Sequence, residues 1–287
     1  MDQLIAKYKY RTSISVPYGI LPMFEDGFIK HKENNNTIEY NVEYIDERCI
    51  YSKEIPKYIN FNYRHNLIEI EYLNTENIET MKEMFQGCTS LIKLNLNNCK
   101  TYNVIDMQRL FCGCYNLKSL DLSSFNTSNV TNMSYMFDSC HLLDNLNIEN
   151  FNTTNVIDMK CMFYNCNSFT LLNLSHFDTK NVTDVSGMFY NCNKLKELNL
   201  SSWNLDNAIE HGSFSSMFYN CNSLQVLRLD NCSHNTIKNI ISSSSFPKNK
   251  IEGITKKIYC KKDNAWGLEV PENWRFEYIE DIKENLS

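Results

Sequence analysis

The chain has 287 residues, and 43% of them are hydrophobic, so it is able to bury a large core and is not expected to be disordered as a whole. The net charge is −6, with 10 basic and 17 acidic side chains in residues 65–235. This acidic balance, without a basic stripe, excludes nucleic acid as an expected partner, because a phosphate backbone binds cationic surfaces.

The start of the chain shows no targeting signal. Residues 1–12 lack the apolar core of a secretory leader, and no apolar run reaches the roughly 18 residues of a membrane span. Neither a lipid-attachment cysteine near the start nor a C-terminal anchor is visible. We therefore expect no membrane insertion, and a location in the cytoplasm or in a larger particle such as a virion. Surface display is expected only if the chain is exported by another route.

Residues 1–64 do not follow the repeat that begins after them, and they predict a β-rich N-terminal cap. Two segments, 8–16 and 36–45, alternate apolar and polar residues as half-buried strands do. A turn signal at 25–27 and a polar run at 31–36 separate them.

From about residue 65 the sequence repeats, and a Met-Phe or Leu-Phe pair marks each unit. The phenylalanines are Phe85, Phe111, Phe137, Phe163, Phe189 and Phe218. They are spaced by 26 residues until the last interval, which is 29 because of an insertion within 208–213. A fixed period of this length is typical of a solenoid, in which each unit buries its apolar side against its neighbours. We predict about seven such units over residues 65–235.

Each unit contains the phrase Leu-x-x-Leu-x-Leu, whose last part alternates with period two and predicts a parallel strand with one buried face. Helix N-cap residues stand four positions before each Met-Phe pair, and residues that tolerate left-handed backbone stand two positions after it. The first set is Thr80, Asp106, Asn132, Asp158, Asp184 and Ser213, and the second is Gly87, Gly113, Ser139, Asn165, Asn191 and Asn220. These signals predict one short helix in each unit. Helix capping explains the recurring aspartates, so they need not form a cluster of catalytic or metal-binding carboxylates.

An asparagine column recurs in every unit: Asn77, Asn103, Asn129, Asn155, Asn181 and Asn207. We expect these amides to form a structural ladder that bonds the backbone of the neighbouring unit at a turn, where groups would otherwise be buried unpaired.

A cysteine column forms a second ladder: Cys88, Cys114, Cys140, Cys166, Cys192 and Cys221. Side chains in register point in parallel, which suits a disulfide poorly, and a 26-residue spacing is not a zinc motif. The six histidines never stand three to five residues apart. We therefore predict buried, reduced thiols, with no metal and no cofactor.

Residues 236–287 lose the repeat and predict a C-terminal cap. The segments 256–260 and 274–279 read as a strand pair that closes this end of the array.

The complete phrase, Met-Phe-x-x-Cys-x-x-Leu-x-x-Leu-x-Leu-x-x-Phe-x-Thr-x-Asn-Val, closely resembles the leucine-rich repeats of BspA-like bacterial surface proteins. The resemblance covers residues 65–232, about 60% of the chain. It implies a right-handed solenoid and a non-enzymatic role in adhesion or recognition. The fold class we predict is an α/β leucine-rich-repeat solenoid, with parallel strands, one short helix per 26-residue coil and β-rich caps at both ends.

Hydrolase, nucleotide-binding and metalloprotease motifs are absent from the sequence, so we do not expect an enzyme and assign no catalytic residue. One column suggests a contact surface. The residue after each phenylalanine is a tyrosine in three consecutive units, Tyr164, Tyr190 and Tyr219, and the insertion that contains His211 lies at the same end. These tyrosines either pack along the flank or form a strip that docks a partner, since tyrosine is enriched at interfaces.

The function we predict is non-catalytic recognition or adhesion, with a protein or glycan surface as partner and the C-terminal half of the array as the contact region. The alternative is a structural component of a larger assembly, such as a phage virion, that packs against copies or neighbours. A thiol-based redox or metal protein is a distant third possibility.

Overall fold

The computed structural model describes residues 4–8, 23–25, 28–33, 36–45, 48–51, 61–63, 67–72, 78–97 and 99–284. The strands at the N-terminal end are β1 (Leu4–Tyr8), β2 (Met23–Glu25), β3 (Phe28–Glu33), β4 (Asn36–Ile45), β5 (Arg48–Tyr51) and β6 (Leu67–Tyr72). Those of the repeats and the C-terminal end are β7 (Lys93–Leu94), β8 (Ser119–Asp121), β9 (Asn145–Asn147), β10 (Leu171–Asn173), β11 (Glu197–Asn199), β12 (Val226–Arg228), β13 (Lys256–Cys260) and β14 (Trp274–Tyr278). The helices are α1 (Asp206–Glu210), α2 (His234–Ser242), α3 (Ile279–Glu284) and a short 3-10 helix, η1 (Asp263–Ala265).

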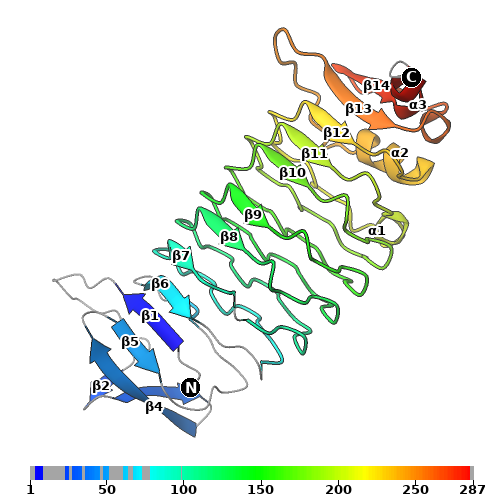
Figure 1. Ribbon diagram of the computed structural model, residues 1–287. Coiled ribbons are helices and arrows are strands. Elements are labelled where there is room, and N and C mark those ends of the chain that lie inside the picture. The colour runs from blue at the N-terminus through cyan, green and yellow to red at the C-terminus, as the bar shows by residue number, and fades with distance from the viewer. Residues whose placement is uncertain are drawn as a thin grey trace.

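Among the described residues the strands form three sheets. The first has the order β2-β3-β4-β5-β1-β6-β7 and is antiparallel except for the parallel pair β6–β7. Strands β8 and β9 pair in parallel, and β10 to β14 form a parallel sheet in chain order. Figure 1 shows β7 to β14 following one another along the length of the molecule. The architecture is therefore of an α/β repeat type, with parallel strands and few short helices.

The strands of neighbouring repeats pair in register. Leu120 lies opposite Leu146, and Leu172, Leu198 and Leu227 lie opposite one another in turn. Residues that share a column of the repeat are therefore neighbours in space. The x positions of the phrase Leu-x-Leu face outward, because successive side chains of a strand point to opposite sides of the sheet.

The prediction of a short helix before each cysteine of the column is wrong, because the described segments from 80–88 to 213–221 contain turns and no helix. The segment that precedes each Cys instead forms consecutive turns, as shown by bonds from the amides of Met84, Gln86 and Cys88 to the carbonyls of Met81, Glu83 and Phe85. The amides between them donate to the next repeat, as Phe85 does to the carbonyl of Leu110. Because alternate amides bond across repeats, the ladder of an α-helix cannot form.

Left-handed backbone was predicted two residues after each phenylalanine, and this prediction is confirmed. The residues with positive φ at this position are Gly87, Gly113, Ser139, Asn165, Asn191 and Asn220. A second left-handed residue stands four positions earlier in each unit: Glu83, Arg109, Tyr135, Cys161, Gly187 and Ser216. A left-handed residue at the third position of a bonded turn is the type II geometry, so the signal that suggested a helix stop belongs to a turn.

The core is a column of stacked phenylalanine rings surrounded by leucine, methionine and valine. The rings of Phe61, Phe85, Phe111, Phe137, Phe163, Phe189 and Phe218 stack in this order, with centroids 5.4–6.0 Å apart. The last six are fully buried, and Phe61 is almost so. Each repeat thus covers the ring of its neighbour, and each buried ring removes a large apolar area from water.

Two polar columns join the repeats, and only one of them is buried. Thr127, which is 1% exposed, donates through Oγ1 to the carbonyl of Asn152 (2.9 Å) and accepts the amide of the same residue (2.8 Å). The predicted asparagine column bonds the preceding repeat, as Asn155 Nδ2 does to the carbonyl of Ser128 (2.7 Å), but this bond is solvent-exposed. The expectation that the asparagines satisfy buried groups is therefore wrong, and the threonines have that role.

The array extends beyond both predicted boundaries of the repeat region. Phe61 stacks on Phe85, and the amide of Phe61 donates to the carbonyl of Met84, although the repeats were predicted to begin at residue 65. At the other end β13 pairs with β12, and β14 pairs with β13, all in parallel. The two predicted C-terminal strands are present, and they continue the sheet.

The N-terminal region contains strands, as expected for residues 1–64, and the structure adds that they pair in antiparallel fashion. The strand predicted at 36–45 is present as β4. The segment 9–16 of the other predicted strand lies outside the described residues, and so does Asn77.

Candidate functional site

The three tyrosines of the predicted contact strip form one stack. The ring centroids of Tyr164 and Tyr190 are 4.5 Å apart, and those of Tyr190 and Tyr219 are 4.6 Å apart, with interplanar angles of 10° and 16°. Tyr219 is 52% exposed, and the other two are half-buried. Because neighbouring rings cover one another's faces, the strip cannot offer a series of open aromatic faces to a ligand.

A chain of side-chain amides runs beside the tyrosine stack and was not predicted. Asn191 Nδ2 donates to Asn165 Oδ1, and Asn220 Nδ2 donates to Asn191 Oδ1, both over 2.8 Å. At the N-terminal end of the chain, Asn165 Nδ2 donates to Ser139 Oγ over 3.3 Å. These residues hold the left-handed turn positions, so the sequence signal was present, but it was attributed to the backbone alone.

His211 lies outside this cluster. It follows α1 in the insertion, is exposed, and its Nδ1 lies 2.8 Å from the carbonyl oxygen of Asn207 in the same helical turn. Among the described residues, no hydrogen bond or ring contact joins it to the three tyrosines. The structure therefore brings the tyrosines together, whereas His211 occupies a separate position on the surface.

The cysteine column lies in the core, next to the phenylalanine stack. Cys114 Sγ donates to the carbonyl of Phe85 (3.2 Å), and Cys140 Sγ donates to the carbonyl of Phe111 (3.2 Å). The same bond to the phenylalanine of the preceding repeat is made by Cys88, Cys166, Cys192 and Cys221. Burial raises the pKa of the Cys114 and Cys140 thiols well above their usual value, so these sulfur atoms stay protonated near neutral pH. Eleven cysteines of the described region are free thiols.

A second polar cluster lies N-terminal to the tyrosine stack. The Arg109 guanidinium lies 4.8 Å from the centre of the Tyr135 ring, and Cys112 Sγ lies 3.5 Å from Asp138 Oδ2. Burial, with the nearby Asp138 carboxylate, raises the pKa of Cys112 to about 12, and burial also raises the pKa of Asp138. A thiol with so high a pKa is not an activated nucleophile. Within the described ranges no group of three His, Cys, Asp or Glu side chains is arranged to hold a metal ion.

One buried cation lies near the C-terminal end. Lys256 is fully buried on the inner face of β13, where its Nζ donates to Asn249 Oδ1 (3.0 Å) and to the carbonyl of Pro247 (3.3 Å). It also lies 5.3 Å from the centre of the Trp274 ring. Burial lowers the pKa of Lys256 to about 8. These contacts hold the segment around Pro247 against β13 and β14, which is a structural role.

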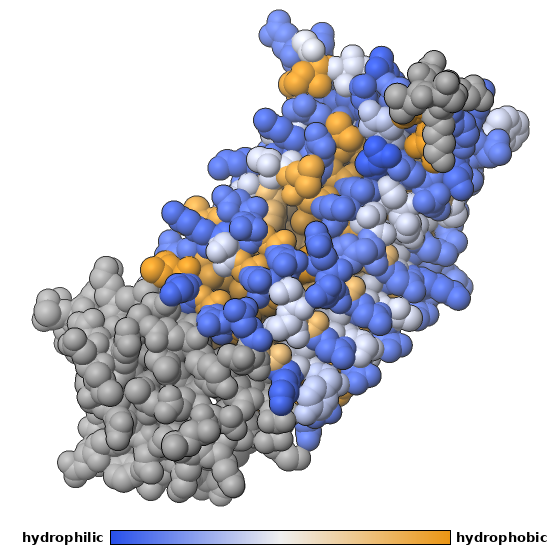
Figure 2. All heavy atoms as spheres, viewed as in Figure 1, coloured by the Kyte–Doolittle hydropathy of each residue, from blue (hydrophilic) through white to orange (hydrophobic). Residues whose placement is uncertain are grey.

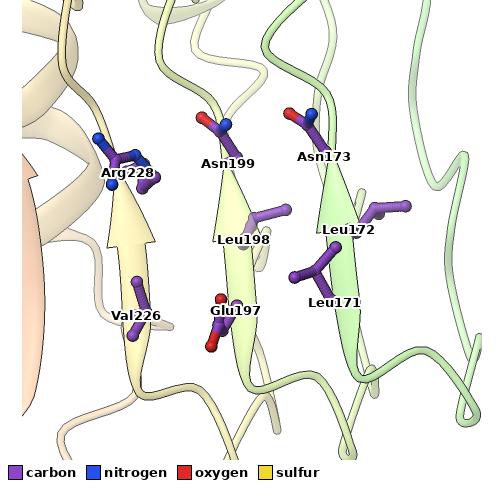
Figure 3. Close-up of a pocket in the computed structure, with 8 residues that line it drawn as sticks. All are labelled: Leu171, Leu172, Asn173, Glu197, Leu198, Asn199, Val226 and Arg228. Atoms are coloured by element: carbon purple, nitrogen blue, oxygen red, sulfur yellow. The ribbon is translucent and has the colours of Figure 1, made fainter. Parts of the chain in front are cut away.

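An open hollow lies on the outer face of β10, β11 and β12 (Figure 3). Its lining includes two outward rows that are aligned by the strand register. One row consists of Leu171, Glu197 and Val226, and the other consists of Asn173, Asn199 and Arg228. Figure 2 shows hydrophobic side chains gathered over these strands between hydrophilic ones. This is the second surface, after the tyrosine stack, on which a partner could be held.

The sequence prediction missed this hollow. It placed no binding residue at the outward strand positions, which include Leu171, a residue that is 59% exposed. The signal was an apolar residue at an outward strand position, which is informative because such positions are polar in the neighbouring strands at Ser119 and Asn145.

Comparison with protein families identifies the repeat region. Residues 57–169 and 113–232 match the family described as "Mycoplasma protein of unknown function, DUF285". The two overlapping matches together span more than half of the chain. The chain belongs to this family. Comparison with curated proteins and with solved structures finds no match.

The DUF285 match agrees with the packing at the N-terminal side of the repeats. It begins at residue 57, before the predicted boundary at 65, and so includes Phe61 of the aromatic stack. It ends at residue 232, so α2, β13 and β14 of this DUF285 protein lie outside it. In the part of the chain that the structure describes, no helix is long and apolar enough to cross a membrane.

Proposed function

We propose that this DUF285 protein is a non-catalytic recognition or adhesion module, in which BspA-like leucine-rich repeats form a solenoid that binds a protein or glycan surface. The parallel strands in register and the buried columns of Leu, Phe, Cys and Thr support the solenoid. Such an array is a rigid scaffold whose outward residues are free to vary, as in other repeat proteins that bind along an extended surface.

The observation that carries the proposal is the contrast between the two sides of the strands. The inward residues of β10, β11 and β12 are all leucine, whereas the outward residues opposite one another are Leu171, Glu197 and Val226. Each repeat thus adds the same packing unit to the core and a different chemical group to the surface. A surface with a distinct group at each position is able to discriminate between partners.

The absence of catalysis is part of the proposal. The described thiols are protonated or buried. The aspartates that precede the turns already accept backbone amides: Asp158 Oδ1 accepts the amide of Lys160 (2.8 Å), and Asp184 Oδ1 accepts that of Ser186 (2.8 Å). A general base or nucleophile needs a free lone pair facing a substrate. These groups serve the backbone instead.

The test is a binding survey with the purified full chain. The chain is applied to an array of glycans and is used to select from a library of displayed random peptides, and its mass in solution is measured by light scattering. Saturable binding of a defined glycan or peptide by a monomer supports the proposal. Absence of both, from a folded chain, contradicts it. Replacing Tyr164, Tyr190 and Tyr219 together by serine tests the predicted contact strip, which is wrong if binding is unchanged.

A structural role in a larger assembly is the second candidate, and the position of β14 favours it. β14 is the last strand of its sheet, and no described strand pairs with its outer edge. Unpaired strand edges recruit further strands. Concentration-dependent oligomers that are abolished by a proline at Phe276, in the middle of β14, would support this candidate over the recognition module.

A further inference from the structure

The hollow on β10, β11 and β12 presents a row of hydrogen-bond donors. Asn173 Oδ1 accepts the amide and hydroxyl of Ser175, and Asn199 Oδ1 accepts those of Ser201. With their oxygens occupied, both side chains have Nδ2 left as a donor, and neither Nδ2 forms a hydrogen bond with another described residue. Next in the row, Arg228 is held by Asp230 through Nε and Nη2 and lies 4.7 Å from the centre of the Tyr259 ring. The row is therefore preorganised to donate to oxygen atoms.

The second row presents one carboxylate between two aliphatic side chains. Glu197 is exposed and lies opposite both Leu171 and Val226 in the strand register. None of the ion pairs formed by the described residues involves Glu197. A cation with an apolar stem fits this arrangement, because the stem is able to pack on the aliphatic groups while the charged head reaches the carboxylate. Lysine and arginine side chains have this form.

The size of the hollow fits a short extended segment. Neighbouring strands lie about 4.8 Å apart, so the three strands span about 10 Å, which is the length of about three extended residues. Backbone carbonyls of such a segment are the oxygens that the amides of Asn173 and Asn199 would meet. The pattern of donors on one side and a carboxylate among aliphatic groups on the other matches a peptide with a basic side chain.

The same geometry disfavours a sugar as occupant. The electron-rich face of an aromatic ring attracts the C–H groups of a sugar, and no aromatic ring lines the hollow. The neighbouring Tyr259 has Arg228 over its ring, and the rings of the tyrosine stack cover one another. The hollow thus offers polar and aliphatic contacts without an open aromatic face.

We infer that the outer face of β10, β11 and β12 binds an extended segment of a protein partner that places a lysine or arginine side chain against Glu197, between Leu171 and Val226. This inference rests on the proposed function and names the partner class for it. The charge complementarity of Glu197 selects the basic residue, and Asn173 and Asn199 orient the segment through its carbonyl groups.

The experiment selects peptides from a displayed random library with the full chain and measures binding of the enriched peptides, made synthetically, by calorimetry. We expect enriched peptides to share a Lys or Arg, and its replacement by Gln to weaken binding roughly tenfold, because a charge pair covered at an interface is strongly coupled. Glu197→Gln should weaken binding of the basic peptide to a similar extent, and Glu197→Lys should shift selection toward acidic peptides. The matched control, Glu149→Gln, removes the same charge at an exposed position outside the hollow and should leave binding unchanged.

Several outcomes overturn the inference. The inference is wrong if the enriched peptides lack a basic residue. It is also wrong if Glu197→Gln binds the basic peptide as tightly as the unmodified chain does. Self-association that Leu171→Ser abolishes would assign the face to a second copy of this chain instead. Binding of a glycan without any peptide also overturns it but leaves the proposed function standing, whereas a folded chain that binds neither contradicts both.

Discussion

The threonine and asparagine columns join the same repeats in different surroundings. Thr127 and Asn152 exchange two hydrogen bonds in the interior, and Asn155 donates one bond to Ser128 at the surface, between the same two repeats. Both columns recur through the array, yet Thr127 is 1% exposed and Asn155 is exposed. The difference teaches that a polar residue repeated in every unit indicates a hydrogen bond repeated between units. Burial then decides how much each of these hydrogen bonds contributes to stability.

The cysteine and tyrosine columns show the same contrast. The thiols are fully buried and donate to carbonyls of the phenylalanine stack, whereas the tyrosines stack on the flank with Tyr219 half exposed. A buried polar group must have its partner because water cannot replace it, and an exposed one need not. Four predictions test this distinction.

The largest expected effect is a loss of stability at alkaline pH. Burial raises the pKa of the folded thiols, to about 12 for Cys221 and Cys232, whereas unfolded thiols titrate near 8.5. Above pH 8.5 the unfolded chain releases protons that the folded chain keeps, so the free energy of unfolding falls as pH rises. The loss is up to about 1.4 kcal/mol per thiol for each pH unit. Urea unfolding between about pH 7 and pH 10 measures it.

The alkaline prediction has its own control. Cys140→Ala should reduce the slope of the unfolding free energy against pH by the contribution of one thiol. A free energy of unfolding that stays constant over this pH range would contradict the prediction, as would rapid modification of nearly all thiols in the native chain at neutral pH.

The next effect is the loss of one ring from the aromatic stack. Phe137→Ala removes contacts with Phe111 and Phe163, whose ring centroids lie 5.8 and 5.4 Å away, and leaves a cavity in the middle of the array. We expect a loss of about 3–5 kcal/mol. Chemical denaturation measures it, with Phe137→Leu as the milder control, and a loss below about 1 kcal/mol would mean that the stack is not the core.

The third effect concerns the buried threonine. Thr127→Val keeps the shape of the side chain and removes its hydroxyl, so the amide and carbonyl of Asn152 lose their partner in the interior. We expect a loss of about 1–3 kcal/mol. Thr127→Ser retains the hydroxyl and should be milder, and equal losses for the two variants would argue against the hydrogen bonds as the cause.

The smallest effect is expected for the exposed asparagine. Asn155→Ala removes the bond to the Ser128 carbonyl, but water is able to replace it, so the loss should be about 0.5–1 kcal/mol. Measured beside Thr127→Val, this variant tests the comparison directly. A larger loss for Asn155→Ala than for Thr127→Val would reverse the roles assigned to the two columns.

Much of the fold was predictable because the sequences of the repeats align with one another. The period predicted that the leucine, cysteine and asparagine columns would become rows in space, and the strand positions β7 to β12 follow from the alternating phrase. The helix was wrong because Asp158 and Asn165 are equally suited to helix ends and to turns, and local signals do not say whether an amide bonds within its own repeat or to the next one. The candidate site was only partly predictable: the tyrosines were found, but the hollow around Glu197 was not.

The sequence by itself determined the strand phrase, the left-handed position after each phenylalanine and the identity of each row, because all of these depend on residues within one 26-residue unit. Only the tertiary structure decided which rows are buried, which amides bond across repeats, and where the surface is open. Burial is a property of neighbouring repeats: the same side chain is exposed or covered according to how the next unit packs, and no single unit contains that information.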